Sequence, residues 1–236
     1  DRLFRVERNV FVNVPSNKTA SYDWESNILF FANNVYYNSS FMSYACKTPV
    51  YQVHETYYID SGFTANQFWK STGCDYDAEP VPHGQNYRGN TLVVAVDAHL
   101  EKFVTLSSKL DSSLDGDTII EFDHNTYLFD DDITVWQNSL LESTDPGIPD
   151  YLTWTEWQDS GKDPNSTFEI TSDLCFEDAA NLDFRLLDTC TAKNNGSGDY
   201  LQFIDHDGAQ VTQDFYGNAR NAVSYTHLTL PTIRLV

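Results

Sequence analysis

The chain has 236 residues and a formal net charge of −21, with 35 Asp and Glu residues against 14 Lys and Arg residues. This excess of negative charge repels nucleic acid and anionic membranes at neutral pH, so the sequence predicts neither as a partner. No apolar run approaches the roughly 18 residues that cross a bilayer, so membrane insertion is not expected either. Abundant aromatic residues, with frequent Asn, Asp, Ser and Thr, favour short strands joined by tight turns.

Strand-like runs that join a polar residue to β-branched or aromatic ones recur along the chain. Clear examples are 9–13, 34–38, 55–59 and 125–129, with a weaker one at 97–104. Their starts lie 21 to 27 residues apart, except for one interval of about twice that length. The missing run is expected near 75–79, next to a Pro- and Gly-containing insertion loop that the sequence places near 75–90.

A unit of this length is too short to bury its own apolar face. Stacked units share a continuous core, and their parallel strands hydrogen-bond from one unit to the next. The repeated Asn suits a turn with left-handed backbone geometry, and stacked Asn side chains can hydrogen-bond between units. The spacing therefore predicts a parallel-stranded solenoid with its rungs over 1–148, followed by further rungs and a capping region over 149–222.

The stretch 149–160 differs from the runs before it and predicts one short helix. Thr153 suits the N-cap and Glu156 stands three residues later, which is a capping-box pattern. Gly161 then ends the helix. Leu152 and Trp157 are expected to face the stacked strands.

Three segments resemble the end of a known family, the secreted right-handed parallel β-helix (pectin-lyase-like) proteins. They are WQDSGKDPNS at 157–166, LCFEDAANLDFRL at 174–186, and the Asp- and Gly-containing stretch 205–220. The chain departs from the family pattern at 188–193. The resemblance implies an all-β, right-handed parallel β-helix with a short helix and an irregular C-terminal cap. It also implies that Trp157, Gly161 and Asp163 are structural and close the open end of the solenoid.

The last residues resemble something other than a protein family. Residues 223–232, VSYTHLTLPT, resemble the conceptual translation of a transposase-end sequencing adapter. We therefore expect 223–236 to be a non-native tail that adds little to the core, and the chain to be a C-terminal fragment open at both ends.

Four cysteines, Cys46, Cys74, Cys175 and Cys190, are present in a chain poor in Lys. The absence of a C-x-x-C pair argues against a zinc site. The even number instead favours disulfides and an extracellular or cell-surface location. Sequential pairing, Cys46 with Cys74 and Cys175 with Cys190, is one of three possible connectivities, and buried free thiols remain the alternative.

Catalytic candidates follow from two chemistries that β-helix enzymes use. A lyase needs a base beside a cation-neutralised carboxylate, and a hydrolase needs two carboxylates on neighbouring rungs. The candidate bases are His83, Arg88, His99 and Lys102, and the candidate acids are Asp97 and Asp123. A solvated loop or surface position is the simpler interpretation of each.

Two further groups of residues suggest ligands. Asp111, Asp115 and Asp117 surround a glycine, and oxygen ligands at such short spacing suit Ca²⁺, although a plain Asp-Gly turn explains them as well. Trp69 and Trp136 are candidates for stacking against sugar rings. Trp154 and Trp157 fit packing within the cap better.

The sequence leaves two functions open. The first is a non-catalytic surface protein with a glycan-binding or adhesin-like role, whose partner is a polysaccharide or cell-surface glycan. The second is a polysaccharide lyase, or failing that a glycoside hydrolase, that acts on an acidic polysaccharide. Fold alone does not decide between them.

Overall fold

The structure is a computed structural model, and three parallel sheets make up most of it. It describes residues 2–14, 27–44, 50–60, 64–65, 69–72, 86–89, 91–96, 99–100, 103–107, 120–131, 136–138, 152–161, 163–171, 175–193 and 195. The strands of each sheet are short, as the β-branched and aromatic runs of the sequence predict.

The first sheet, sheet A, has five strands, and the second, sheet B, has six. Sheet A consists of β1 (Arg2–Glu7), β3 (Asn27–Ala32), β6 (Val50–Val53), β10 (Asn86–Gly89) and β14 (Ile120–Asp123). Sheet B consists of β2 (Val10–Val12), β4 (Val35–Tyr37), β7 (Thr56–Ile59), β11 (Leu92–Ala95), β15 (Thr126–Phe129) and β17 (Thr167–Ile170).

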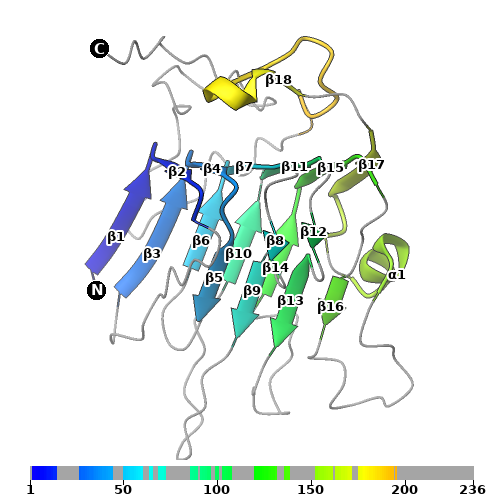
Figure 1. Ribbon diagram of the computed structural model, residues 1–236. Coiled ribbons are helices and arrows are strands. Elements are labelled where there is room, and N and C mark those ends of the chain that lie inside the picture. The colour runs from blue at the N-terminus through cyan, green and yellow to red at the C-terminus, as the bar shows by residue number, and fades with distance from the viewer. Residues whose placement is uncertain are drawn as a thin grey trace, which may run out of the picture.

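The third parallel sheet, sheet C, has four strands. They are β5 (Phe41–Tyr44), β9 (Trp69–Thr72), β13 (Val104–Ser107) and β16 (Trp136–Asn138). A small parallel pair joins β8 (Thr64–Ala65) to β12 (His99–Leu100). From β3 to β16, each pass of the chain adds a strand to sheet A, then to sheet B and then to sheet C, and β17 adds the last strand of sheet B (Figure 1).

Sheet B confirms the alignment of the clearest sequence runs and corrects one. The runs 9–13, 34–38, 55–59 and 125–129 supply β2, β4, β7 and β15 of this one sheet. The expected run at 97–104 is wrong, because β11 pairs with both β7 and β15. β11 carries Leu-Val-Val-Ala and no aromatic residue, so the aromatic pattern does not mark it in the sequence. Residues 86–89 of the segment expected to be a loop form β10.

Aromatic rings stack from strand to strand inside the molecule. The Phe11 and Tyr36 ring centroids lie 4.9 Å apart, and those of Tyr36 and Tyr57 lie 4.4 Å apart. In-register parallel strands are about 4.8 Å apart, so equivalent rings come into face contact. This row belongs to the core cluster that also contains Phe31 and Phe122 of sheet A.

The turn from sheet A to sheet B has left-handed geometry at the same place in successive passes. Arg8, Asn33, His54 and His124 have φ values of 59°, 57°, 57° and 53°. The sequence predicted that the repeated Asn would adopt this conformation, but the residue before it does so here. The turn after sheet B does use Asn, since Asn13 and Asn38 have φ values of 55° and 46°.

The short helix begins and ends as its sequence predicts. Helix α1 (Trp154–Asp159) has Thr153 as its N-cap, and both halves of the capping box with Glu156 are formed. Gly161 has a φ of 82°, and its N–H donates to the carbonyl of Gln158. Leu152 and Trp157 are buried, as expected.

A second segment, residues 175–193, lies along the outer face of sheet B, and we call it the strap (Figure 1). It contains β18 (Phe176–Asp178), a 3₁₀ turn (Ala179–Asn181) and β19 (Asp183–Leu186), and the two strands pair antiparallel. Phe176 and Phe184 pack against Tyr58. The strap therefore covers a side of the stacked strands, whereas α1 lies at their C-terminal end.

Candidate functional site

Polar side chains from successive passes lie next to one another at the turn between sheet A and sheet B. Between most neighbouring passes, a side-chain oxygen accepts a hydrogen bond from the backbone N–H of the equivalent residue one pass earlier. Asn34 Oδ1 accepts from Asn9 N at 2.9 Å, and Glu55 Oε1 accepts from Asn34 N at 3.1 Å. We call these residues the polar ladder: Asn9, Asn34, Glu55, Thr91, Asn125 and Ser166. Each such bond satisfies a backbone donor that the turn removes from the sheets.

The ladder ends at a buried carboxylate. Asp163 is fully buried and accepts hydrogen bonds from four side chains. Trp157 Nε1 donates at 2.9 Å and Tyr127 Oη at 3.0 Å to one oxygen, while Asn125 and Ser166 donate to the other. Burial raises the pKa of this carboxyl, and the four donors partly offset that rise. The predicted cap residues thus meet in one network.

Asp123 and His124 form a second pair at the turn after β14. His124 Nδ1 lies 2.9 Å from Asp123 Oδ2, and Asp123 is 9 % exposed. Asn165 binds the same carboxylate through its backbone N–H at 3.1 Å and through Nδ2 at 3.2 Å. The carboxylate therefore orients the imidazole and also holds the loop before β17. Asp123 was a catalytic candidate from the sequence, whereas His124 was not, because only the turn brings it against Asp123.

A third polar group lies at the turn after sheet B. Tyr37 Oη donates to Asp60 Oδ2 at 2.6 Å, and Asn38 Nδ2 donates to Asp60 Oδ1 at 2.7 Å. The hydrogen bond to Asp60, with burial and the negative charge, raises the pKa of Tyr37 to about 12. This phenol is therefore a donor at neutral pH, and the group ties two passes together.

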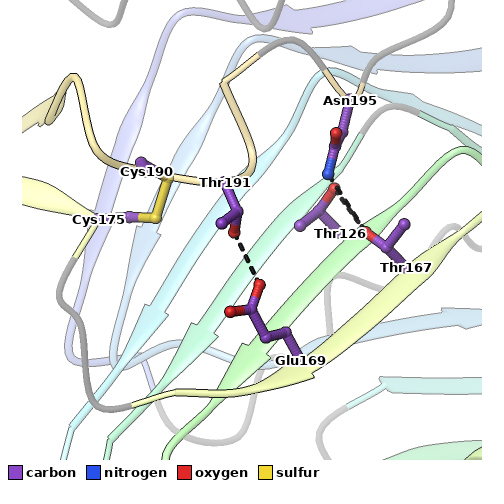
Figure 2. The surroundings of a disulfide bond; sticks show 7 residues. All are labelled: Thr126, Thr167, Glu169, Cys175, Cys190, Thr191 and Asn195. Atoms are coloured by element: carbon purple, nitrogen blue, oxygen red, sulfur yellow. Dashed lines mark hydrogen bonds between the residues drawn. A yellow bond between two sulfur atoms is a disulfide. The ribbon is translucent and has the colours of Figure 1, made fainter.

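A disulfide closes the strap on itself, and polar contacts at its end join it to sheet B (Figure 2). Cys175 and Cys190 are bonded and almost fully buried, which confirms half of the sequential pairing. Thr191 Oγ1 donates to Glu169 at 2.9 Å, and Asn195 Nδ2 lies 3.5 Å from Thr167 Oγ1. Cys46 and Cys74 lie outside the described residues.

Few of the other predicted site residues come together. His99 pairs through β12 with Thr64, and Arg88 stands in β10 between Gln52 and Phe122. Neither strand brings a candidate base next to Asp123 in the pairing register. The remaining catalytic and calcium candidates lie outside the described residues: His83, Asp97, Lys102, Asp111, Asp115 and Asp117.

The two tryptophans proposed for sugar stacking share one register row of sheet C. Trp69 and Trp136 are the partners of Val104 on either side, and Phe41 follows Trp69 in the row. The next row contains Met42, Lys70, Thr105 and Gln137. Rows alternate between the two faces of a sheet, so the tryptophans and Lys70 belong to opposite faces. Sugar binding by Trp69 and Trp136 stays a prediction.

Within the described ranges, no three His, Cys, Asp or Glu side chains gather closely enough to hold a metal ion. Among the helices in those ranges, none is long and apolar enough to cross a membrane.

Comparisons of the chain with protein-family models, with curated proteins and with solved structures find no match.

Proposed function

We propose that this chain is part of a right-handed parallel β-helix that acts outside the cell and presents a side of its stacked strands to a glycan. The observation that carries the proposal is the register: in all three parallel sheets, equivalent residues of successive passes form straight rows. Strands about 4.8 Å apart repeat one chemical group along a face, which suits a polymer that is itself a repeat.

Two properties support the location outside the cell and the kind of partner. A buried disulfide joins Cys175 to Cys190, and such bonds persist in oxidising compartments. The net charge of −21 disfavours nucleic acid and anionic membranes but leaves neutral glycans and cation-bridged acidic ones as partners.

We assign glycan binding to sheet C, because the strap packs on the outer side of sheet B and covers it. One register row of this sheet contains a polar residue on each of three neighbouring strands, namely Lys70, Thr105 and Gln137. Sugar hydroxyls need such donors and acceptors for orientation and specificity.

Glycan arrays, followed by depolymerisation assays on pectin, alginate and chondroitin, test this function. We expect binding without cleavage, weakened by Lys70→Ala with Gln137→Ala. Trp136→Ala distinguishes the two rows: loss of binding at unchanged stability would assign the glycan to the tryptophan row. Loss of stability with binding per folded molecule retained would assign it to the polar row. No binding in the array would contradict the proposal.

One observation favours the enzyme as a second candidate. A carboxylate that holds Nδ1 of an imidazole leaves Nε2 as a proton acceptor, and Asp123 stands in this relation to His124. The expected result is cleavage of an acidic polysaccharide that His124→Gln abolishes. Arg8→Gln, at the equivalent exposed turn position of the first pass, is the matched control and should leave activity intact. Absence of cleavage by the unchanged chain would eliminate this candidate.

A further inference from the structure

The first strand of sheet B, β2, has an open edge. Among the described strands it pairs with β4 alone and ends the order of the sheet. Asn13 N donates to Tyr37 O across this pair at 2.9 Å. Successive residues of a strand direct their N–H and C=O groups to opposite sides. The N–H and C=O groups of Val10 and Val12 therefore lie on the open edge of β2.

The side chains of β2 leave apolar surface exposed at the same place. Val10 and Val12 are 38 % and 39 % exposed, whereas Val35, the partner of Val10 in β4, is buried in the cluster that the strap forms with sheet B. Phe11 belongs to the other face, where it stacks on Tyr36 and is half-buried. Both faces of sheet B thus end at β2 with apolar side chains in contact with solvent.

The charge distribution favours this edge as a place where a second copy can approach. Two copies repel each other at long range, because each carries a net charge of −21. Residues 9–14, NVFVNV, contain no charged residue, and residues 1–14 contain three arginines against one Asp and one Glu. Charged side chains and prolines usually protect edge strands from pairing. The neighbouring strand β1 carries the ion pair of Arg5 and Glu7, but β2 has no such protection.

The strand β2 is complementary to itself in the antiparallel direction. If two copies pair about Phe11, Val10 of one copy stands opposite Val12 of the other. Residues opposite each other in such a pair exchange both of their backbone hydrogen bonds, and the exchanged groups are the ones on the open edges. Phe11 then meets Phe11 of the second copy, and the valines of both copies form one apolar patch on the outer face.

We propose that a second copy of this chain binds at β2, so that two sheets B join into one through antiparallel β2 strands. The contact is two-fold symmetric and uses the open edge of both copies, so assembly stops at the dimer. One short strand pair buries much less than the about 1,600 Å² of a typical stable complex, so the dimer is weak and forms at high protein concentration. This inference is independent of the glycan proposal, which concerns sheet C.

Sedimentation of the full chain over a range of protein and salt concentrations tests the dimer. We expect a monomer–dimer equilibrium that shifts toward the dimer as salt screens the repulsion between the copies. Val12→Pro removes an N–H that faces away from β4, and Val12→Lys adds a charge at the contact. Each should raise the dissociation constant by about tenfold or more while circular dichroism stays unchanged. Ile170→Lys, on the 55 % exposed residue at the opposite edge of sheet B, is the matched control and should leave the dissociation constant unchanged.

A cross-linking experiment tests the antiparallel register. A mixture of Val10→Cys and Val12→Cys chains should form an intermolecular disulfide faster than either variant alone, with the unchanged chain as background. The pairing holds these two positions about 5.5 Å apart, within the range that a disulfide spans. Equal cross-linking in the mixture and in the single variants would contradict this register.

Two results of the sedimentation experiment would overturn the inference. One is a chain that stays monomeric at every protein and salt concentration. The other is a dimer that Ile170→Lys weakens as much as Val12→Lys, because the contact would then lie away from β2. If Val12→Pro does not fold, Val12→Lys and the cysteine mixture still decide.

Discussion

The polar ladder and the Asp163 network stabilise the same turn by different means. The ladder repeats one small contact, a side-chain oxygen on the backbone N–H of the previous pass, with separations of 25, 21, 34 and 41 residues along the chain. The Asp163 network occurs once and gathers an indole, a phenol, an amide and a hydroxyl on one carboxylate. The ladder tolerates Asn, Glu, Thr or Ser at its positions, whereas the network depends on particular residues. A repeated contact therefore spreads stability over many positions, and a terminal contact concentrates it in a few.

The largest effect is expected where stability is concentrated. Trp157→Ala removes a fully buried indole that packs on Phe122 and donates to Asp163. We expect a loss of about 3–5 kcal/mol in the free energy of unfolding, with aggregation, because the core at the end of the sheets becomes exposed. Urea unfolding and light scattering measure the two effects. Unchanged stability with lost glycan binding would instead make Trp157 a ligand residue.

The strap comes next in expected size. Cys175→Ala with Cys190→Ala opens a loop of 15 residues, which the chain-entropy account values at about 3 kcal/mol. We expect limited proteolysis to cut within 175–193 while the parallel sheets keep their circular dichroism. Loss of the circular dichroism of the sheets together with cleavage of the strap would show that the strap is part of the core and not a cover over it.

Asn125 joins the ladder to the Asp163 network, and Asn34 lies within the ladder alone. Each accepts from a backbone N–H, but only Asn125 also donates to Asp163. Asn34→Ala should cost about 1–3 kcal/mol through the unsatisfied backbone donor, and Asn125→Ala should cost more. Thermal unfolding of both variants compares them. Equal losses would remove the distinction between repeated and terminal contacts.

A smaller loss is expected at the N-terminus of α1. Thr153→Ala deletes the hydroxyl that accepts from Glu156 N and should cost about 1 kcal/mol. Thr155→Ala, on the exposed side of the same helix, is the control and should be neutral. A loss at Thr155 equal to that at Thr153 would contradict a specific role of the cap, since the higher helix propensity of Ala predicts no loss at Thr155.

The smallest expected effect is a dependence of the free energy of unfolding on pH. Burial raises the pKa of Asp163 in the folded chain, so its contribution is fully present at low pH and is lost as the pH rises through that raised value. The stability of the unchanged chain relative to Asp163→Asn should therefore increase as the pH falls from about 7 to about 4. Denaturant midpoints at several pH values measure this slope, and a slope of opposite sign would contradict the burial effect.

The repeating part of the fold was predictable because its signal recurs. Asn34, Asn125 and the runs after them mark their strands in the sequence, and the register confirms the stack that they indicate. The sequence did not predict β11 at its actual position. Thr91 occupies the ladder position before Leu92, and neither an Asn nor an aromatic run marks this strand in the sequence. Thr153, Glu156 and Gly161 predicted the helix and its end through local chemistry alone.

The candidate sites were less predictable, because they depend on contacts between distant residues. Asp163 was expected to be structural, but no local pattern shows that it binds the side chains of Trp157 in α1, Tyr127 in β15 and Asn125 in the turn before β15. The partner of Asp123 in the loop before β17 is Asn165, which no local pattern connects to it. The position of the strap on sheet B also depends on apolar contacts that spacing does not reveal.

Hydrogen exchange of individual amides tests most directly the claim that the stack is closed at its C-terminal end by the Asp163 network. The amides of Asn34, Thr91 and Asn125 each donate to a ladder side chain one pass on and should exchange slowly. Trp157→Ala should lower protection first at Asn125, then at Thr91, and least at Asn34. Fast exchange at all three amides in the unchanged chain, or an equal loss at all three in the variant, would contradict the account.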